Sequence, residues 1–536
     1  LYLLELERPA RAGPVTVIDE LTAVTSDPAH VHRLAGVSGD GALIAYVSNR
    51  RNGIDFDLWL CEHAAGEHRC LYAPGAWLQP GSGFSPDDRL VSVLVPGERP
   101  LDMELILVDV STGTARPALA HPRQAALVGA PAWVSARSFY VSSTVDREFG
   151  AVVHHDLDTA QTRALSGIGE RFDAEVVAAA DGGTILVIEN RDGADALRLQ
   201  PAARRPRADT APVAEVPLPE PGVVRSHAID PPSLARDGTT VYFTLSTPRL
   251  ASDVFAFDVA TGATRRLTHS PTEVDPRLLV GAQRAEAESF DGLRLPLFVY
   301  RPRDGTPRPP AVVLIHGGPE SQSVLAFNPV IQGLALAGYG VVVPNVRGST
   351  GYGKRYAALD DTTRRLDSVR DLEAVHAFLD TAGFDPRRAA LWGGSYGGYM
   401  VLAGLAFQPD LWAAGVDIVG ISNLVTFLEG TSPYRRAHRE LEYGSLAHDR
   451  EFLAAASPLN SADRIRAPLM VIHGRNDPRV PVAEAQQLAD TLRARGVECE
   501  LAIYEDEGHG LVRLANRLNA YPRAVAFLDR VLGRDG

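Results

Sequence analysis

The first half of the chain repeats one pattern of short β-strands at intervals of about 40 to 50 residues. Each repeat opens with a turn of Asp, Gly or Ser, continues into an alternating strand and ends in a second strand pair. The opening segments are SGDGALIAYVSN, SPDDRLVSVLV, VSARSFYVSS, AADGGTILVIEN and ARDGTTVYFTL. Strand quartets with this period are typical of β-propeller blades. The pattern predicts a propeller over residues 1–275, with six or seven blades of which the first is incomplete.

A different rhythm begins after about residue 280. Continuous apolar segments such as PAVVLIHG, RAALWGG and PLMVIHG alternate with amphipathic segments such as SVRDLEAVHAFLDTAG. This alternation predicts an α/β-hydrolase type of domain over residues 276–536, with a mostly parallel, doubly wound sheet covered on both faces. In such sheets the functional groups lie at the carboxyl ends of the strands.

Composition narrows the class of partner. The chain has 536 residues, too many for a single core, which agrees with two domains. A net charge of −13 argues against nucleic acid or an anionic membrane as the partner. No apolar run is long enough for a transmembrane helix, and three cysteines are too few for a disulfide framework. We therefore expect a cytoplasmic protein, and because the chain does not begin with Met we expect a preceding segment.

The segment LWGGSYGGYM places several glycines around one serine, directly after an apolar run. Its core has the form G-x-S-x-G, from Gly393 to Gly397, with Ser395 in the middle. Small and apolar residues at helical spacing follow, so the context is strand, sharp turn and helix. This is the context of a nucleophile elbow, in which glycines allow a tight turn and a close approach of strand and helix. The alternative is an ordinary glycine-rich turn.

Other polar motifs follow strands of the same predicted sheet and decide between these alternatives. HGRNDPRVP contains Asp477 and DEGHG contains His509, so the order is Ser395, Asp477, His509, the order of α/β-hydrolases. Serine needs a base to take its proton, His509 is suited to that task, and Asp477 would orient and stabilise the imidazolium. The oxyanion needs two donors, which we assign to the amides of Tyr396 and Gly318. These motifs together predict a serine hydrolase.

Four further residues compete for roles in this site. Asp417 and Asp506 are alternative acids, because both follow the elbow in the chain. We prefer Asp477 because it lies just past a strand, where a turn can aim it. His316 and His473 each end a strand next to glycine, and we interpret both as structural, hydrogen-bonded histidines.

At these motifs the chain resembles the prolyl oligopeptidase family of serine peptidases, and most closely its acylaminoacyl-peptidase branch. The matching segments are HGGPESQ, VPNVRGSTGYGKRY, WGGSYGGYM, HGRNDPRVP and DEGHG. The resemblance implies a propeller ahead of the hydrolase domain, the triad named above, and a contact between Arg479 and a substrate carbonyl. An alternative for Arg479 is a structural ion pair with a propeller carboxylate. The propeller lacks a paired-Glu motif for a free amino terminus, which disfavours a dipeptidyl peptidase.

The insert GISNLVTFLEGTSPYRRAHRELEYG is expected to build the pocket for the residue before the scissile bond, the P1 residue. Phe427 and Tyr434 are the candidate lining residues, and an apolar pocket would favour an apolar or aromatic P1 side chain. Packing in the core or in a lid is the alternative for both.

The segment CEHAAGEHRC predicts a hairpin that turns at Ala65-Gly66. With that turn Cys61 would face Cys70 and His63 would face His68, all on one side. Four such side chains could bind zinc, and two opposed cysteines could form a disulfide. We prefer a third interpretation, a blade hairpin with two half-buried thiols, so no metal site is predicted.

The sequence as a whole predicts a serine peptidase that cleaves short peptides through an acyl-enzyme and releases N-acylated or N-terminal residues. The propeller is expected to restrict substrate size. The expected partners are short peptides, with a homo-oligomer left open, and no cofactor is expected. A small-molecule amidase or esterase with the same triad is the first alternative. A non-catalytic propeller that binds other proteins is the second.

Overall fold

The computed structural model describes residues 1–3, 22–180, 183–201, 214–224 and 231–533. By its internal contacts the chain divides into two compact units. The first comprises Leu1–Glu170, Ala174–Val187 and Leu199–Val213, and the second Arg171–Asp173, Ile188–Arg198 and Ala214–Gly536. The second unit thus holds the last strands of the repeating region together with the whole α/β region.

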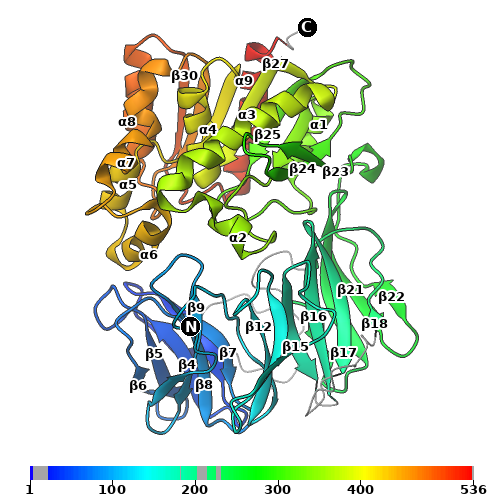
Figure 1. Cartoon of the computed structure of the whole chain (residues 1–536), viewed down its shortest axis with the longest axis vertical. Helices are drawn as coiled ribbons and strands as arrows, with labels where there is room; N and C mark the ends of the chain where they lie inside the picture. The colour runs from blue at the N-terminus through cyan, green and yellow to red at the C-terminus, as the bar shows by residue number, and fades with distance from the viewer. Residues whose placement is uncertain (4–21, 181–182, 202–213, 225–230, 534–536) are drawn as a thin grey trace. The chain divides into compact units, whose positions relative to one another are not determined.

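The repeating region forms four-stranded antiparallel sheets, each built from strands consecutive in sequence (Figure 1). The described residues contain five such sheets and one two-stranded sheet, which confirms the β-propeller. The total of six or seven blades stays a prediction. The two-stranded sheet is β1 (Tyr2–Leu3) and β2 (Thr22–Ala23), and the others are β3 (His32–Val37), β4 (Leu43–Ser48), β5 (Asp57–Glu62) and β6 (Glu67–Tyr72); β7 (Gln79–Phe84), β8 (Leu90–Pro96), β9 (Met103–Asp109) and β10 (Ala115–Pro117); β11 (Ala132–Ser135), β12 (Ser138–Ser143), β13 (Ala151–Asp156) and β14 (Thr162–Ala164); β15 (Ala174–Ala180), β16 (Thr184–Arg191), β17 (Ala194–Pro201) and β18 (Ala214–Glu215); β19 (Ser233–Leu234), β20 (Thr240–Thr247), β21 (Leu250–Asp258) and β22 (Ala263–Arg266).

The recurring Asp-x-x-Thr-Gly sequence closes the outer hairpin of a blade. At the end of β9 one carboxylate oxygen of Asp109 accepts hydrogen bonds from the amides of Ser111 (3.0 Å) and Thr112 (2.9 Å). Gly113 follows with a φ of +73°, which glycine adopts without strain. Hydrogen bonds from Ser111 and Thr112 lower the pKa of Asp109 to about 2. The motif therefore encodes the turn and carries no chemistry.

The register of one propeller hairpin differs from the prediction. In the pairing of β5 with β6, Cys61 lies opposite His68, and Cys70 lies opposite Trp59. The turn is longer than expected because Glu62 pairs with Glu67, and Gly66 occupies the left-handed region with a φ of +65°. All three cysteines of the chain are free, and Cys61 is buried while Cys70 is exposed. The prediction that Cys61 faces Cys70 and that His63 faces His68 is therefore wrong. The zinc and disulfide alternatives, which depended on that pairing, are wrong as well.

The α/β region contains one eight-stranded sheet in the order β23-β24-β26-β25-β27-β28-β29-β30. The first two strands form an antiparallel hairpin, and β24 joins the sheet antiparallel to β26. From β26 to β30 all neighbours are parallel, as the apolar strand pattern predicts. The strands are β23 (Gln283–Glu288), β24 (Arg294–Tyr300), β25 (Pro310–Ile315), β26 (Gly340–Pro344), β27 (Asp385–Gly394), β28 (Ala414–Ile418), β29 (Leu469–Gly474) and β30 (Cys499–Tyr504).

Helices cover both faces of this sheet and give it two cores. One core joins the sheet to α3 (Arg365–Thr381), α4 (Tyr396–Phe407), α5 (Leu424–Gly430) and α8 (Ala483–Ala494). The other joins it to α1 (Pro329–Leu336) and α9 (Leu514–Val531). The other α-helices of this region are α2 (Lys354–Ala357), α6 (Pro433–Tyr443) and α7 (Arg450–Ala455).

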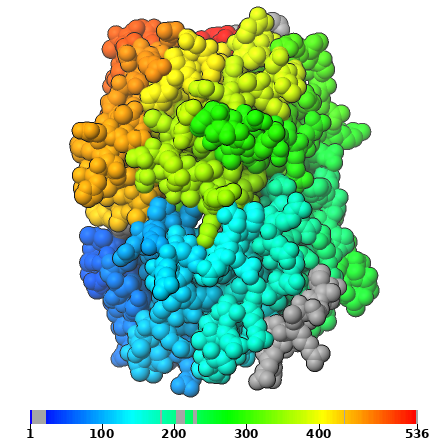
Figure 2. Space-filling model, in the orientation of Figure 1, coloured from blue at the N-terminus to red at the C-terminus, as the bar shows by residue number. Residues whose placement is uncertain are grey.

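Strand β27 illustrates why both faces must be covered. Leu391 packs in one core, and its neighbours Ala390 and Trp392 pack in the other. In Figure 2 the green, yellow and orange atoms of this region hide its strands from view. These features confirm the doubly wound α/β-hydrolase fold. In the described part of the chain no helix has the length and apolarity needed to cross a membrane.

Candidate active site

Ser395 lies in the sharp turn between β27 and α4. Its φ is +58° and its ψ is −117°, a strained combination for a residue with a side chain. Two backbone hydrogen bonds hold the turn: the Ser395 amide donates to the carbonyl of Ile418 (2.8 Å), and its carbonyl accepts from the amide of Tyr399 (3.0 Å). The strand, the turn and the helix are those of the predicted nucleophile elbow.

The glycines around Ser395 are required by close backbone contacts. A Cβ atom added to Gly393 would lie 2.2 Å from the carbonyl oxygen of Gly397. One added to Gly397 would lie 2.2 Å from the carbonyl oxygen of Ile315, at the end of β25. At Gly398 it would lie 2.3 Å from a carboxylate oxygen of Asp417. The predicted close approach of helix and strand is confirmed, and the strained φ falls on the serine.

The three predicted triad residues form one hydrogen-bonded chain. His509 Nε2 lies 3.0 Å from Ser395 Oγ, and His509 Nδ1 lies 2.7 Å from Asp477 Oδ2. The other oxygen of Asp477 accepts hydrogen bonds from the amides of Arg479 (2.7 Å) and Val480 (2.9 Å). Both oxygens of this buried carboxylate thus have hydrogen-bond partners. The arrangement allows His509 to accept the serine proton while Asp477 balances the resulting charge.

Two residues bring the loop that carries His509 up to the end of β29. Gly474 ends that strand, and a Cβ there would lie 2.1 Å from the carbonyl oxygen of Gly508. Glu507 is buried, and its carboxylate accepts hydrogen bonds from the amides of Val512 (3.0 Å) and Arg513 (2.9 Å), which follow His509 in the chain. The glycine permits the approach and the glutamate fixes the loop.

The competing residues lie elsewhere or have other partners. Asp506 is exposed and pairs with Arg513 at 3.0 Å. Asp417 is buried on β28 against the elbow, as its contact with Gly398 indicates, and His509 is not among its partners in the described residues. His316 bonds to Ser349 Oγ (2.9 Å), and His473 bonds to the carbonyl of Val480 (3.0 Å). The structural interpretation of both histidines agrees with these contacts.

Two backbone amides border the space in front of Ser395. Tyr396 begins α4, so its amide belongs to the first turn, and no acceptor for it lies among the described residues. The loop after β25 packs on the elbow, because a Cβ on Gly317 would lie 3.4 Å from Ser395 Cβ. Gly318 from that loop lines the same small cavity as Ser395 and His509. These positions are compatible with the predicted pair of oxyanion donors.

The segment VPNVRGSTGYGKRY supports this loop. The Asn345 side chain accepts a hydrogen bond from the amide of Ser323 (2.7 Å) and donates one to the carbonyl of Ser323 (3.0 Å). These two bonds connect the end of β26 to the segment after Gly318. Arg347 is almost fully buried and forms ion pairs with Asp371 (2.8 Å) and Asp291 (3.1 Å). The resemblance to known peptidases over this segment thus corresponds to a scaffold for the site.

A buried charged cluster lies behind Tyr396, and the sequence pattern did not indicate it. Arg365 is fully buried and pairs with Asp360 and Glu442. The hydroxyl of Tyr396 donates to Asp360 (3.1 Å) and lies 2.8 Å from the Ser368 hydroxyl. The oxygens of Asp360, Asp361 and Glu442 lie within 4.8 Å of one another, a spacing that a metal ion could bridge. Because Arg365 already supplies a positive charge there, we interpret the cluster as an anchor for Tyr396.

A cavity of about 120 Å³ adjoins Ser395. Phe427 lines it but is buried and packs edge-on against Tyr443, so the pocket and core interpretations both apply. Arg479 also lines it, and its guanidinium has no hydrogen bond or ion pair within the described residues. Tyr434 lies in α6, but its side chain is outside the described part of the structure. The cavity is lined by Gly318, Ser395, Ile421, Phe427, Thr431, Arg435, Arg439, Tyr443, Arg479, Val480 and His509.

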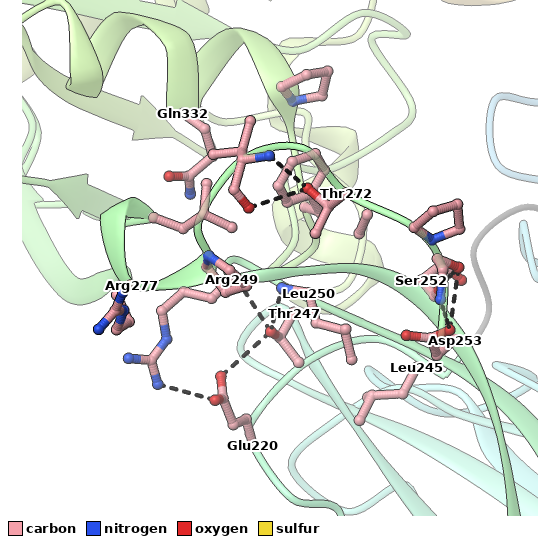
Figure 3. A pocket seen from close by; sticks show the side chains of 18 of the residues that line it. Glu220, Leu245, Thr247, Arg249, Leu250, Ser252, Asp253, Thr272, Arg277 and Gln332 are labelled. Carbon is pink, nitrogen blue, oxygen red and sulfur yellow. Dashed lines mark hydrogen bonds and ion pairs between the residues drawn. The ribbon is translucent and has the colours of Figure 1, made fainter. Parts of the chain in front are cut away.

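A larger cavity of about 730 Å³ lies elsewhere in the second unit (Figure 3). It includes Leu245 and Leu250 from β20 and β21, and Gln332 from α1. Two ion pairs join residues of its lining: Arg249 lies 3.0 Å from Glu220, and Arg266 pairs with Asp253. None of the triad residues borders it, so size alone does not locate the reactive site in this molecule.

Comparison with known proteins finds a family profile that matches part of the α/β region. The sequence profile named prolyl oligopeptidase family matches residues 325–535, which include the whole triad. Residues 325–535 are thus similar to the prolyl oligopeptidase family. The matched residues include the elbow and the loops that carry Asp477 and His509.

Proteins that are similar to this region of the chain carry several names. A Caenorhabditis elegans protein, dipeptidyl peptidase family member 6, is 37% identical over 229 residues, covering 41% of this chain and 31% of that protein. The acylamino-acid-releasing enzyme of Sus scrofa is 28% identical over 267 residues, covering 48% and 36% respectively. The matches thus span about a third of the length of either relative.

The fold comparison extends over the propeller as well. The solved structure of a Mycobacterium tuberculosis puromycin-hydrolyzing peptidase superposes with a TM-score of 0.81 at 24% identity. That alignment covers 94% of this chain and 79% of the other. The order of a propeller followed by an α/β-hydrolase domain is therefore shared with known structures.

Proposed function

We propose that the chain is a serine peptidase that cleaves short peptides through an acyl-enzyme. One observation carries the proposal: the 3.0 Å and 2.7 Å contacts that link Ser395, His509 and Asp477 at the edge of one cavity. The similarity of residues 325–535 to the prolyl oligopeptidase family supports the same reaction class.

In the proposed reaction, Ser395 Oγ attacks the scissile carbonyl while His509 Nε2 takes its proton. The amides of Tyr396 and Gly318 donate to the oxyanion. His509 then protonates the leaving amine, and water hydrolyses the acyl-enzyme with the same histidine as base. Arg479 would donate to a second substrate carbonyl. No cofactor or metal ion takes part in these steps.

The test is labelling of the full chain by a fluorophosphonate together with hydrolysis of an acetylated peptide arylamide. We expect stoichiometric labelling that Ser395→Ala removes, and turnover in the variant lowered by a factor of about 10⁴ or more. Near-normal turnover in Ser395→Ala would overturn the assignment. Absence of labelling in the parent chain would favour the non-catalytic alternative.

We further propose release of N-acylated or N-terminal residues, since relatives carry both acylamino-acid-releasing and dipeptidyl peptidase names. Paired peptides with free and acetylated amino termini separate the two. The ratio of peptide to ester hydrolysis separates a peptidase from a small-molecule esterase. A substrate set on which only small esters are cleaved would favour the esterase.

The propeller is proposed to limit the length of the substrates, because a ring of blades offers only a narrow channel. We keep the boundary between the functional domains at residues 275 and 276, between the end of β22 and the start of β23. Digestion of a short peptide but not of casein is the expected result. Rapid digestion of a full-length unfolded protein would contradict the length limit.

A further inference from the structure

Helix α6 forms one wall of the cavity beside Ser395. It contributes Arg435, Arg439 and Tyr443, which are spaced four residues apart and therefore share one face of the helix. Arg479 borders the same cavity from the loop after β29. Three guanidinium groups thus surround a space of about 120 Å³ that also contains the proposed nucleophile.

The described lining of the cavity is basic. The described residues that line the cavity include three arginines and no Asp or Glu. The guanidinium groups of Arg439 and Arg479 form no hydrogen bond or ion pair within the described part of the chain. Guanidinium groups such as those of Arg439 and Arg479, which border the cavity without an ion pair of their own, are suited to an anionic group of the substrate.

The acidic residues behind this wall have other partners. Glu442 pairs with the buried Arg365. Glu320 lies 4.0 Å from His438, and it interacts with Arg439 only through longer-range electrostatics. Burial and the neighbouring Glu442 raise the pKa of Glu320 to about 7, which weakens its negative charge at neutral pH. The charge on Arg439 therefore remains available toward the cavity.

We infer that the cavity selects an Asp or Glu side chain at P1, with Arg439 as the main residue that recognises its carboxylate and Arg435 beside it on the same face of α6. The inference rests on the proposed peptidase function and names its substrate class. The planar guanidinium binds a carboxylate through two parallel hydrogen bonds. Since a water molecule occupies about 30 Å³, the cavity has the volume of about four waters, enough for a short side chain.

This assignment replaces the apolar P1 residue that Phe427 suggested from the sequence. Phe427 is packed in the core, and only 4% of its surface is exposed. The sequence pattern gave no signal for a role of the α6 arginines, because arginines on an amphipathic helix usually indicate a solvated face. In this fold, that face borders the cavity.

The experiment compares three arylamides that differ only at P1: N-acetyl-Glu, N-acetyl-Gln and N-acetyl-Phe. Glu and Gln have the same shape, so their ratio isolates the charge. We expect kcat/KM for Glu to exceed that for Gln by about tenfold or more. Arg439→Gln and, independently, Arg435→Gln should each lower this ratio by about tenfold. Arg466→Gln is the matched control, because Arg466 is 72% exposed and pairs with Asp410 on the surface.

A charge swap provides the positive counterpart. Arg439→Glu should invert the preference, so that N-acetyl-Lys arylamide becomes a better substrate than N-acetyl-Glu arylamide. Fluorophosphonate labelling of each variant checks that the fold and the triad persist. If one variant fails to label, the other arginine variant still tests the inference, together with the ratio of kcat/KM for the Glu and Gln arylamides in the parent enzyme.

Three results would overturn the inference. The first is a parent enzyme that labels and turns over but prefers Phe or treats Glu and Gln alike, which leaves the peptidase function intact. The second is a dependence on a free C-terminal carboxylate, seen with amidated and free peptides that share an apolar P1 residue. The third is a chain that neither labels nor cleaves any of these substrates, in which case the proposed function fails as well.

Discussion

The carboxylate of Asp477 lies 2.7 Å from Nδ1 of His509 and has no exposed surface. Burial by itself would raise the pKa of this carboxyl, but the hydrogen bond and charge of His509 and two backbone amides outweigh it. The net result is a pKa below the usual range. An acid that stays ionised keeps the proton on Nδ1, so that Nε2 is the atom that accepts the serine proton.

Asp477→Asn should therefore lower kcat by about 10⁴ while the protein stays folded, because an amide can stabilise the wrong tautomer of His509. Steady-state hydrolysis of a peptide arylamide measures the loss. Asp506→Asn is the matched control, since Asp506 is 53% exposed and pairs with Arg513. A loss in Asp477→Asn no larger than that of the control would show that another acid serves His509.

Arg479→Ala should weaken peptide substrates far more than a small aryl ester. Its guanidinium has no hydrogen bond or ion pair among the described residues, and it borders the cavity of Ser395. Loss of one charge-assisted hydrogen bond corresponds to a factor of about 10 to 100 in kcat/KM for the peptide. The ester lacks the second carbonyl, so it reports on the triad alone. Equal losses on both substrates would mean that Arg479 supports Asp477.

Gly397→Ala should destabilise the domain by about 3 kcal/mol or more, because the new Cβ would meet a backbone oxygen that cannot move aside. That oxygen, on Ile315, lies 2.2 Å from the Cβ position. Gly333→Ala is the control: no atom lies within 4 Å of its Cβ position in α1. Alanine there should stabilise the helix by about 0.5–1 kcal/mol. Urea unfolding of both variants measures the difference, and equal stability would refute the packing argument.

Asp417→Asn should change how stability depends on pH. Asp417 is 1% exposed, and burial raises its pKa to about 7 although a hydrogen bond from the Gly420 amide opposes the shift. Between about pH 4 and 7 the folded state holds a proton that the unfolded state releases. The stability of the parent chain should therefore fall as pH rises through this window.

Asparagine cannot ionise, so the variant should escape that loss. The free energy of unfolding of the variant, relative to that of the parent chain, should therefore rise between pH 4 and pH 8. At about 1.4 kcal/mol per pKa unit, this rise is on the order of a few kcal/mol. Thermal melts from pH 4 to pH 8 measure it, and Asp410→Asn on the exposed surface serves as control, since Asp410 is 81% exposed. An advantage that does not vary with pH would contradict the proposed burial of an ionisable carboxyl.

Local patterns predicted the elements that depend on short-range physics. The alternating strands and their Asp-x-x-Thr-Gly turns encode blades, because the turn is closed by contacts within a few residues, as at Asp109. The glycines around Ser395 likewise encode a close strand–turn–helix contact. The order of Ser395, Asp477 and His509 after strands of one sheet was sufficient to predict their convergence, because parallel strands end at one edge.

The sequence by itself determined the two kinds of domain, the triad candidates and the elbow, since each depends on residue type and spacing along the chain. Only the tertiary structure decided the pairing of Cys61 with His68, the anchoring of Tyr396 by Arg365, and the placement of Arg435 and Arg439 beside Ser395. A hairpin register can shift by two residues without altering the alternation of the strands, because the side chains keep their faces. Residues far apart in sequence meet only when packing brings their elements together, so no local spacing records those contacts.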